Sequence, residues 1–516
     1  MNPIGHFLTS SGMKTARLSA IYLEENLFAE RIRIEAIIRP GLPVFRITGT
    51  NGRSRDREER IRTALLASGI QFPYCTVLVN LSPADRVKGS ALLDLPIAVC
   101  LMLAIGVPGL RRRIDRQTLF LGELSLTGEI CDLPELAAWA LCGADAGFSR
   151  VFLPLSAGTR LPQSAVSWIG VRHLSDIIEG QVEQVGLILE PLIRNLPAFE
   201  IPDRILRMLL LAAAGKHGLL FVGPPGSGKS VAARLLYELL PDPDAVERRR
   251  IIKNGLLFRD MDLTGTRPLR QPHHSITVTG MVGGGTPLRA GEANRASDGL
   301  LLLDELSEYD RQVIEALREP LESHEISHNR GGRPGRLPAR FWLAATANPC
   351  PCGYFNSKGR VCHCSRIHTD KRKQLLSGPF ADRIDLQTVY EKGMPAVLRT
   401  ADDLIDIRRK ILRAVEIQRA RNGSAYNGEL VGLGVDDFCT LADERADRVW
   451  LEIRENTISR RRSAGIRRLA RTIADLDEAS CIRAEDLLEA RSYSLPENFW
   501  EAPPPLAARL KPRRRA

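Results

Sequence analysis

The chain has 516 residues, which is too many for one hydrophobic core, and we expect about three domains. Its hydrophobic content of 44% is ordinary for a globular protein, and no apolar run is long enough to span a bilayer, so we predict no membrane partner. The net charge of +11 favours polyanions without selecting one of them. Because the N-terminus lacks the basic and apolar parts of a signal peptide, we expect a cytoplasmic protein.

The first segment, residues 1–180, alternates strand-like and helix-like patterns. Apolar and β-branched runs predict strands over residues 44–48, 76–80 and 119–125. Helical periodicity predicts helices over residues 57–67, 95–104 and 134–146. We interpret this segment as a mixed domain of helices and strands, and residues 181–200 as a linker to the next domain.

A glycine-rich loop lies between an apolar run at residues 219–222 and a helix-periodic run at residues 231–240. The loop fits the pattern G-x-x-x-x-G-K-[ST] and consists of Gly223, Pro224, Pro225, Gly226, Ser227, Gly228, Lys229 and Ser230. Its backbone N–H groups and the positive end of the following helix would hold phosphate oxygens. Lys229 would reach the outer phosphates of ATP, and the Ser230 hydroxyl would bind Mg²⁺. A chance glycine turn is the alternative, which the flanking strand and helix disfavour.

Two further strands end in polar side chains that ATP hydrolysis needs. The apolar run at residues 299–303 ends in Asp304 and Glu305, and the run at residues 341–347 ends in Asn348. Because the carboxyl ends of parallel strands meet at one edge of a sheet, these side chains should face the phosphate loop. We expect Asp304 to hold Mg²⁺, and Glu305 and Asn348 to orient the attacking water. Helix caps or surface ion pairs are the alternative for the two acids.

A β-hairpin is predicted over residues 325–340, just before the strand that ends in Asn348. Its tip carries Arg330, Arg333 and Arg336. A flexible basic tip suits contacts with DNA phosphates that do not depend on sequence. An exposed turn that arginine keeps in solution is the alternative.

One group of cysteines is compact in the sequence: Cys350, Cys352, Cys362 and Cys364. In a cytosolic protein such a cluster favours metal binding over disulfides. Four thiolates can hold a tetrahedral, structural Zn²⁺ and leave no open position for water. Free cysteines in a loop are the alternative.

The remaining segments differ in character. Residues 201–395, which hold the phosphate loop and the polar strand ends, are predicted to form an α/β core. Residues 400–492 are charged and helix-periodic, which predicts a helical lid. Residues 493–516 are rich in proline and arginine, and we expect a loose basic tail.

These motifs resemble those of AAA+ ATPases in their order: phosphate loop, strand with Asp-Glu, then strand with Asn. The resemblance is closest to the YifB/ComM family of magnesium-chelatase-like proteins. The stretches that carry it are residues 267–275 (RPLRQPHHS), 283–292, 347–353, 376–386 and 470–476. They extend over most of the chain after residue 200.

The resemblance implies a homo-oligomer, a hexameric ring with ATP at the subunit boundaries. Arg383 matches the finger that reaches into a neighbour's site, and Arg461 matches the sensor arginine of the lid. The stretch 273–292 would form a second hairpin directed at the pore, where Arg289 would contact DNA.

The segment 1–180 resembles the Lon-protease-like α+β domain, also called ChlI-like, with which members of this family begin. The matching stretches are residues 80–85, 94–98 and 122–128. The alignment puts Leu92 and Ala137 at the positions of the protease serine and lysine, so we predict that this domain has no peptidase activity.

The function implied is that of a ring-forming ATPase that couples ATP hydrolysis to DNA remodelling, in the manner of ComM-like helicases that move branched DNA during recombination or natural transformation. The alternative is the ATPase subunit of a magnesium-chelatase-type metal insertion complex, which usually lacks the Lon-like domain and the cysteine cluster. A scaffold that binds nucleotide without hydrolysis is disfavoured by the intact Lys229, Asp304, Glu305 and Arg383.

Overall fold

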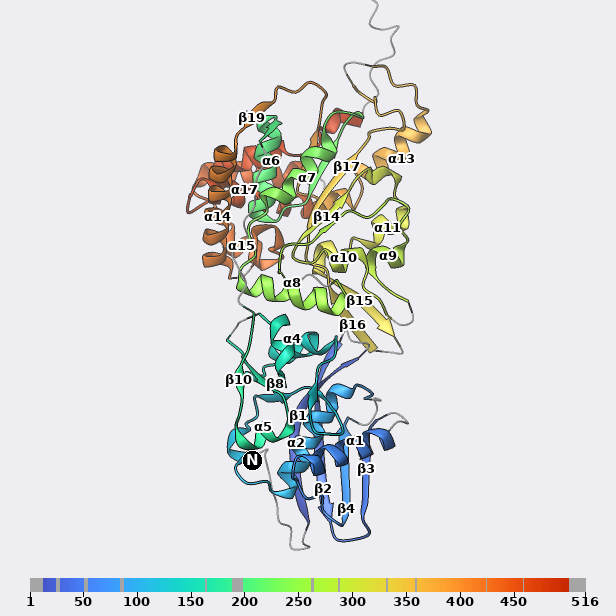
Figure 1. The fold of residues 1–516 in the computed structure, drawn as a ribbon. Coiled ribbons are helices and arrows are strands. Elements are labelled where there is room, and N and C mark those ends of the chain that lie inside the picture. Colours follow the sequence, from blue (N-terminus) through green and yellow to red (C-terminus); the bar gives the residue numbers. More distant parts are fainter. Residues whose placement is uncertain are drawn as a thin grey trace, which may run out of the picture. The chain divides into compact units, whose positions relative to one another are not determined.

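The computed structural model describes residues 13–24, 28–50, 54–83, 88–162, 165–187, 198–260, 264–285, 288–330, 333–357, 360–423, 425–457 and 459–500. The chain divides into two compact units (Figure 1): Met1–Pro191 with Asp244–Thr266, and Leu192–Pro243 with Arg267–Ala516. Most of the predicted tail, residues 501–516, and residues 188–197 of the predicted linker lie outside the described residues.

The first unit contains two four-stranded sheets, with the strand orders β1-β2-β4-β3 and β10-β9-β8-β5. The strands are β1 (Lys14–Glu24), β2 (Phe28–Arg39), β3 (Val44–Thr48), β4 (Thr76–Ser82), β5 (Thr118–Phe120), β8 (Arg150–Pro154), β9 (Ser167–Val171) and β10 (Glu183–Gln184). A short hairpin pairs β6 (Glu123–Leu124) with β7 (Ile130–Cys131). The helices are α1 (Ser54–Ala67), α2 (Asp94–Ile105), α3 (Leu110–Arg113), α4 (Leu136–Asp145), α5 (Leu174–Glu179) and α8 (Ala245–Phe258).

Burial explains the sequence patterns of this unit. Along β4 the buried side chains of Val77, Val79 and Leu81 alternate with half-buried ones, as in a strand with one face on the core. Helix α2 is buried over almost its whole length, which is why its sequence is apolar on every side.

Helix α8 belongs to the first unit by its contacts, although the sequence analysis placed it within the segment 201–395. Its Ile252 and Leu256 join the hydrophobic core of the first unit. On its surface, Arg249 and Lys253 pair with Asp145 of α4 at 2.7 and 2.5 Å. Apolar periodicity alone could not assign this helix, because it does not identify the core against which a helix packs.

The second unit is built on a five-stranded sheet with the order β13-β14-β17-β12-β18, in which all neighbouring strands are parallel. The strands are β13 (Leu269–Arg270), β14 (Leu300–Leu303), β17 (Trp342–Ala347), β12 (Leu219–Val222) and β18 (Leu386–Val389). Strands β12, β14 and β17 are buried throughout, as continuous apolar runs in a parallel sheet should be. The predicted α/β core is thus confirmed.

Helices surround this sheet and extend into a helical C-terminal region (Figure 1). They are α6 (Asp203–Gly215), α7 (Lys229–Leu239), α9 (Val278–Val282), α10 (Glu292–Arg295), α11 (Arg311–Ala316), α12 (Pro320–Ser323), α13 (Arg366–Leu376), α14 (Ala401–Asn422), α15 (Leu433–Phe438), α16 (Glu444–Asn456), α17 (Arg460–Leu476) and α18 (Ala484–Ser492). Two antiparallel pairs complete the unit: β11 (Phe199–Ile201) with β19 (Val397–Arg399), and β15 (Glu325–Arg330) with β16 (Arg333–Pro338).

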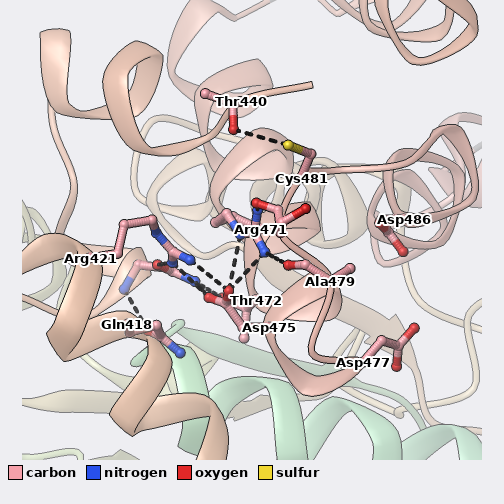
Figure 2. Close-up of polar contacts among 12 residues, drawn as sticks. Gln418, Arg421, Thr440, Arg471, Thr472, Asp475, Asp477, Ala479, Cys481 and Asp486 are labelled. Atoms are coloured by element: carbon pink, nitrogen blue, oxygen red, sulfur yellow. Dashed lines mark hydrogen bonds and ion pairs between the residues drawn. The ribbon is translucent and has the colours of Figure 1, made fainter. Parts of the chain in front are cut away.

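A buried polar network holds the helical region together (Figure 2). Arg421 of α14 donates both Nη groups to the Asp475 carboxylate of α17, at 2.7 and 2.8 Å. Arg471, one turn earlier on α17, donates to the same carboxylate and is fully buried. Asn427 donates to Thr472 at 3.0 Å and to Asp475 at 2.7 Å. The stretch 470–476, which carries part of the family resemblance, therefore joins two helices of the lid.

Candidate nucleotide-hydrolysis site

The phosphate loop connects the carboxyl end of β12 to the amino end of α7. Gly226 and Gly228 have positive φ angles of 69° and 100°, which favour glycine. A Cβ atom on Gly223 would lie 2.1 Å from the Tyr390 carbonyl oxygen, so the close approach of the two chain segments requires glycine there. Strand, loop and helix thus have the arrangement that phosphate binding needs.

Lys229 points back into the loop. Its Nζ donates to the carbonyl oxygens of Gly223 and Pro224 at 2.9 and 2.7 Å and lies 3.3 Å from Asn348 Oδ1. Burial lowers the pKa of Lys229 to about 8, although Asp304 and Glu305 act in the opposite direction. The structure therefore brings Lys229, at the start of α7, together with Asn348, just after β17, although the two residues are 119 positions apart in sequence.

The Asp304 carboxylate lies beside the start of α7. Its Oδ1 accepts a hydrogen bond from the Ser230 hydroxyl at 2.8 Å and another from the Thr346 hydroxyl. A carboxylate and a hydroxyl at this distance form the oxygen donor set that suits Mg²⁺, so these residues fit the expected ion. Thr346 was not identified by sequence reasoning, although it is the one hydroxyl residue in the otherwise apolar run of β17.

Glu305 has an exposed side chain and a left-handed backbone, with φ of 54° and ψ of 48°. Its N–H donates to Thr346 Oγ1 at 3.1 Å, which fixes the turn after β14. A non-glycine residue in this conformation carries strain of about 1 kcal/mol, which is common at functional sites. The turn leaves the Glu305 carboxylate outside the sheet edge, where a water molecule could be activated.

A cavity of about 530 Å³ adjoins the loop, and its lining includes Ile201, Ser227, Val231, Tyr390 and Met394. The aliphatic and aromatic side chains offer flat apolar contacts next to the phosphate-binding backbone. This combination fits a nucleotide, whose base is apolar on its faces and whose phosphates are charged.

Arg383 and Arg461 lie away from the phosphate loop. The loop follows the carboxyl ends of the parallel strands, whereas the two arginines lie at the amino ends. Arg383 comes just before β18, and the register pairs the first residues of β18 and β12, Leu386 and Leu219. The four residues of β12 separate these amino ends from the loop by about 13 Å. Both arginines pair with Glu322 of α12, and the Arg461 Nη2–Glu322 Oε1 distance is 2.6 Å.

The neighbours of Arg461 have different surroundings. Arg462 is largely buried and donates to the Ile384 carbonyl oxygen at 2.5 Å and to Ser494 Oγ at 2.8 Å, so it holds the lid on the strand that follows Arg383. Arg460 is exposed. Of the three consecutive arginines, Arg461 alone pairs with the carboxylate that Arg383 also uses.

The four predicted metal ligands are grouped in space. The sulfur atoms of Cys350, Cys352, Cys362 and Cys364 all lie within 4.8 Å of one another. Three of the separations are 3.3, 3.6 and 3.6 Å. Zn–S bonds of 2.3 Å in a tetrahedron place sulfur atoms about 3.8 Å apart, so the group fits Zn²⁺.

The thiols of the cluster differ in acidity. Burial opposes ionisation of Cys352, but hydrogen bonds from the Tyr354 N–H and neighbouring thiols outweigh it and lower its pKa to about 7. Burial raises the pKa of Cys350 and of Cys362, so these two thiols would lose their protons on binding a metal. The loop also contacts the nucleotide site, because a Cβ atom on Gly353 would lie 2.3 Å from Pro225 Cδ. Metal binding here would fix a segment that contacts the phosphate loop.

The predicted hairpin over 325–340 is present as β15 and β16. Arg336 is exposed and its Nη1 lies 3.4 Å from Glu325 Oε2. The side chains of Arg330 and Arg333 lie outside the described residues. Arg289 is exposed on the other predicted hairpin, where the structure has α9 followed by an isolated antiparallel bridge between Gly284 and Arg289.

In the first unit, Leu92 and Ala137, which the resemblance assigned to the positions of the protease serine and lysine, are both fully buried. Neither side chain has a nucleophilic or basic atom. Among the described residues, none of the helices combines the length and the apolar character that crossing a bilayer requires.

Comparison with known proteins agrees with these features. Residues 202–396 match the family described as magnesium chelatase, subunit ChlI, residues 34–157 match subunit ChlI of Mg-chelatase, and residues 403–494 match its C-terminal part. The competence protein ComM of Haemophilus influenzae is 32% identical over 494 residues, which cover 90% of this chain and 94% of ComM. YifB of Escherichia coli is 32% identical over 483 residues, with the same coverage.

A shorter match joins the chain to the 38 kDa magnesium-chelatase subunit of Rhodobacter capsulatus, with 30% identity over 166 residues, 28% of this chain and 47% of that subunit. The ChlI-like families are AAA+ ATPases that use ATP and Mg²⁺, and the parallel sheet with its helical C-terminal region fits them. The chain belongs to the YifB/ComM family of magnesium-chelatase-like AAA+ ATPases.

Proposed function

We propose that this protein is a ring-forming ATPase, a hexamer, that couples ATP hydrolysis to DNA remodelling, as a ComM-like helicase that moves branched DNA in recombination or natural transformation. One observation carries the proposal. The phosphate loop lies at the carboxyl ends of the strands of one parallel sheet, and the pair Arg383 and Arg461 lies at their amino ends. Each copy would therefore complete the site of its neighbour, as the heterologous contacts of a ring allow.

In this site Lys229 would exchange its bonds to loop carbonyls for bonds to the ATP phosphates. Bound Mg²⁺ would neutralise charge on the phosphates. Glu305 would take the proton of the attacking water, and Asn348 would orient that water. The neighbour's Arg383 and Arg461 would stabilise the charge that develops on the γ-phosphate, and an arginine finger of this kind contributes roughly 10³–10⁵ in rate.

DNA is the proposed partner for two reasons. One of the relatives covered over 94% of its length is named a competence protein. The chain carries a net charge of +11 and an antiparallel hairpin with Arg330, Arg333 and Arg336. Such a hairpin, together with Arg289, would contact the phosphate backbone in the ring pore. We further propose that the first unit is a Lon-like domain without peptidase activity, and that Cys350, Cys352, Cys362 and Cys364 bind structural Zn²⁺.

A metal-insertion ATPase is the second candidate, because part of the chain is similar to a magnesium-chelatase subunit. That match covers 28% of this chain and about half of the subunit, whereas ComM matches over nearly the whole of both chains. The difference in coverage favours the DNA-remodelling function.

ATPase rates with no DNA, single strands, duplex and a four-way junction test the proposal. We expect at least one DNA form to raise turnover several-fold, and the Lys229→Ala variant to be inactive in every condition. Equal rates in all four conditions would contradict a DNA-driven function and favour the metal-insertion alternative.

A further inference from the structure

Glu322 joins the two arginines of the proposed composite site. Its Oε1 accepts from the guanidinium groups of both Arg383 and Arg461. Arg383 is 6% exposed, whereas the side chains of Arg461 and Glu322 are 46% and 41% exposed, so the cluster opens to the surface. Two guanidinium groups that converge on one anionic oxygen are arranged as they would be around a phosphate oxygen.

The surroundings favour an anion between Arg383 and Arg461. A cavity of about 340 Å³ adjoins the cluster. Two other cations of its lining already have carboxylate partners there, Lys216 with Glu429 and Arg468 with Asp385. Burial and the nearby Arg461 lower the pKa of Arg383, while Glu322 raises it. Arg383 and Arg461 repel each other, and the Glu322 carboxylate compensates this repulsion. In the proposed site, the phosphate of a neighbour's ATP would take over that role.

Glu322 also leads directly to the basic hairpin. It lies on α12, which ends at Ser323, and β15 begins at Glu325. The Ser323 hydroxyl donates to the Glu325 carbonyl oxygen at 2.8 Å, and the Ser327 N–H donates to Glu319 Oε1 at 2.9 Å. These bonds tie the base of the hairpin to α12, so a displacement of Glu322 would be passed on to β15.

We infer that Glu322 is a positioning residue that takes, in a subunit without an ATP-bound neighbour, the place of the neighbour's γ-phosphate between Arg383 and Arg461. When ATP in the neighbouring subunit engages the two arginines, Glu322 is released, and α12 with the β15–β16 hairpin becomes free to move. DNA that binds the β15–β16 hairpin acts on the same contact, between Glu322 and the two arginines, through β15 and α12. This inference rests on the proposed function, because it requires both the composite site and the DNA contact.

The test is Glu322→Gln in the full-length protein, with ATP hydrolysis measured with and without the most stimulating DNA. Glutamine keeps the size of the side chain and removes its charge. Loss of the Glu322 charge should raise the DNA-free rate by about 3- to 10-fold and bring the stimulation by DNA close to one. It should also lower the KM for ATP, because no carboxylate then competes with the γ-phosphate for the two arginines. Glu322→Asp, which keeps the charge, should restore part of the stimulation.

Glu452→Gln is the matched control, because Glu452 is also a half-exposed carboxylate and pairs with Arg491 at 3.1 Å in the lid. It should behave as wild type. A DNA-free rate and a stimulation that are both unchanged in Glu322→Gln would overturn the inference, as would a rate that falls together with the melting temperature. Failure of the composite site itself is recognised separately, since Arg383→Ala would then retain full turnover.

Discussion

Asp385 lies two residues after Arg383 and fixes the segment that carries it. Its buried carboxylate accepts from His217 Nδ1 at 2.7 Å and from Arg468 at 3.1 Å. The other nitrogen of the His217 ring lies 2.7 Å from the Thr472 hydroxyl. Burial alone would raise the pKa of Asp385, but Arg468 and His217 outweigh it and hold that pKa well below its usual range.

Replacing Asp385 with Asn should lower the free energy of unfolding at pH 7 by about 3 kcal/mol, because buried cations lose their partner. The folded-state pKa of Asp385 is lowered, so its stabilisation is present at neutral pH. This stabilisation is lost as the pH falls below about 4, where the unfolded chain takes up the proton first. Denaturant unfolding at pH 7 and pH 3.5 should therefore give a smaller difference between the two proteins at the lower pH.

Asp436→Asn is the control for this experiment, since Asp436 is an exposed carboxylate that pairs with Arg467. It should change stability little at either pH. A difference between Asp385→Asn and wild type that is the same at both pH values would show that the charge of Asp385 is not what stabilises this segment.

At the scale of single elements, the cysteine loop would connect the proposed zinc site to the nucleotide site. Purified protein should contain about one Zn²⁺ per chain, and Cys362→Ser should lose it. Because Gly353 packs on Pro225, the freed loop should also raise the KM for ATP several-fold. Metal analysis and ATPase kinetics check both effects, with Cys481→Ser as a control outside the cluster. A metal-free wild-type protein with normal kinetics would exclude zinc.

The β15–β16 hairpin offers a second test at this scale. Replacing Arg330, Arg333 and Arg336 together with Ala should weaken binding to single-stranded DNA at least tenfold. The slope of log affinity against log salt should become shallower by about 2, as three phosphate contacts predict. Fluorescence anisotropy over a salt series measures both quantities.

The control for the hairpin removes the same charge from the lid, through Arg409, Arg413 and Arg445, which are exposed on α14 and α16. An equal loss of affinity in the two triple variants would mean that total charge, and not the hairpin, determines DNA binding.

How much of the structure can be predicted from the sequence differs from one kind of feature to another. The strands before Asp304 and Asn348 could be predicted, because each is a short apolar run whose end must reach one edge of a parallel sheet. The hairpin could be predicted from its glycine, proline and arginine tip. The grouping of the cysteines followed from their spacing. In each case the signal lies within a few residues of the feature.

Features that depend on distant segments could not be predicted in this way. Glu322 meets Arg461 across more than a hundred residues, and nothing near either residue indicates the pair. The same holds for Thr346, whose role depends on Asp304 in the neighbouring strand, and for α8, whose core lies in the first unit. Such contacts are set by the way the sheet and the two units fold, and a local pattern does not contain that information.

At the scale of the whole molecule, the proposed catalytic groups fall into two sets within one unit. One set lies at the carboxyl ends of the strands and consists of Lys229, Asp304 and Asn348. The other lies at the amino ends and consists of Arg383 and Arg461. In the proposed ring, the carboxyl ends of the strands in one copy and the amino ends of the strands in its neighbour would face each other around ATP.

Mixing two inactive variants tests this arrangement most directly. Glu305→Gln should bind ATP without hydrolysing it, and Arg383→Ala should do the same for lack of the finger. In mixed rings about one interface in four would join an intact Glu305 to an intact Arg383. The account predicts that each variant alone is inactive and that the mixture, combined before ATP is added, recovers a clear fraction of wild-type turnover. A mixture as inactive as its parts, or full turnover by Arg383→Ala alone, would contradict it.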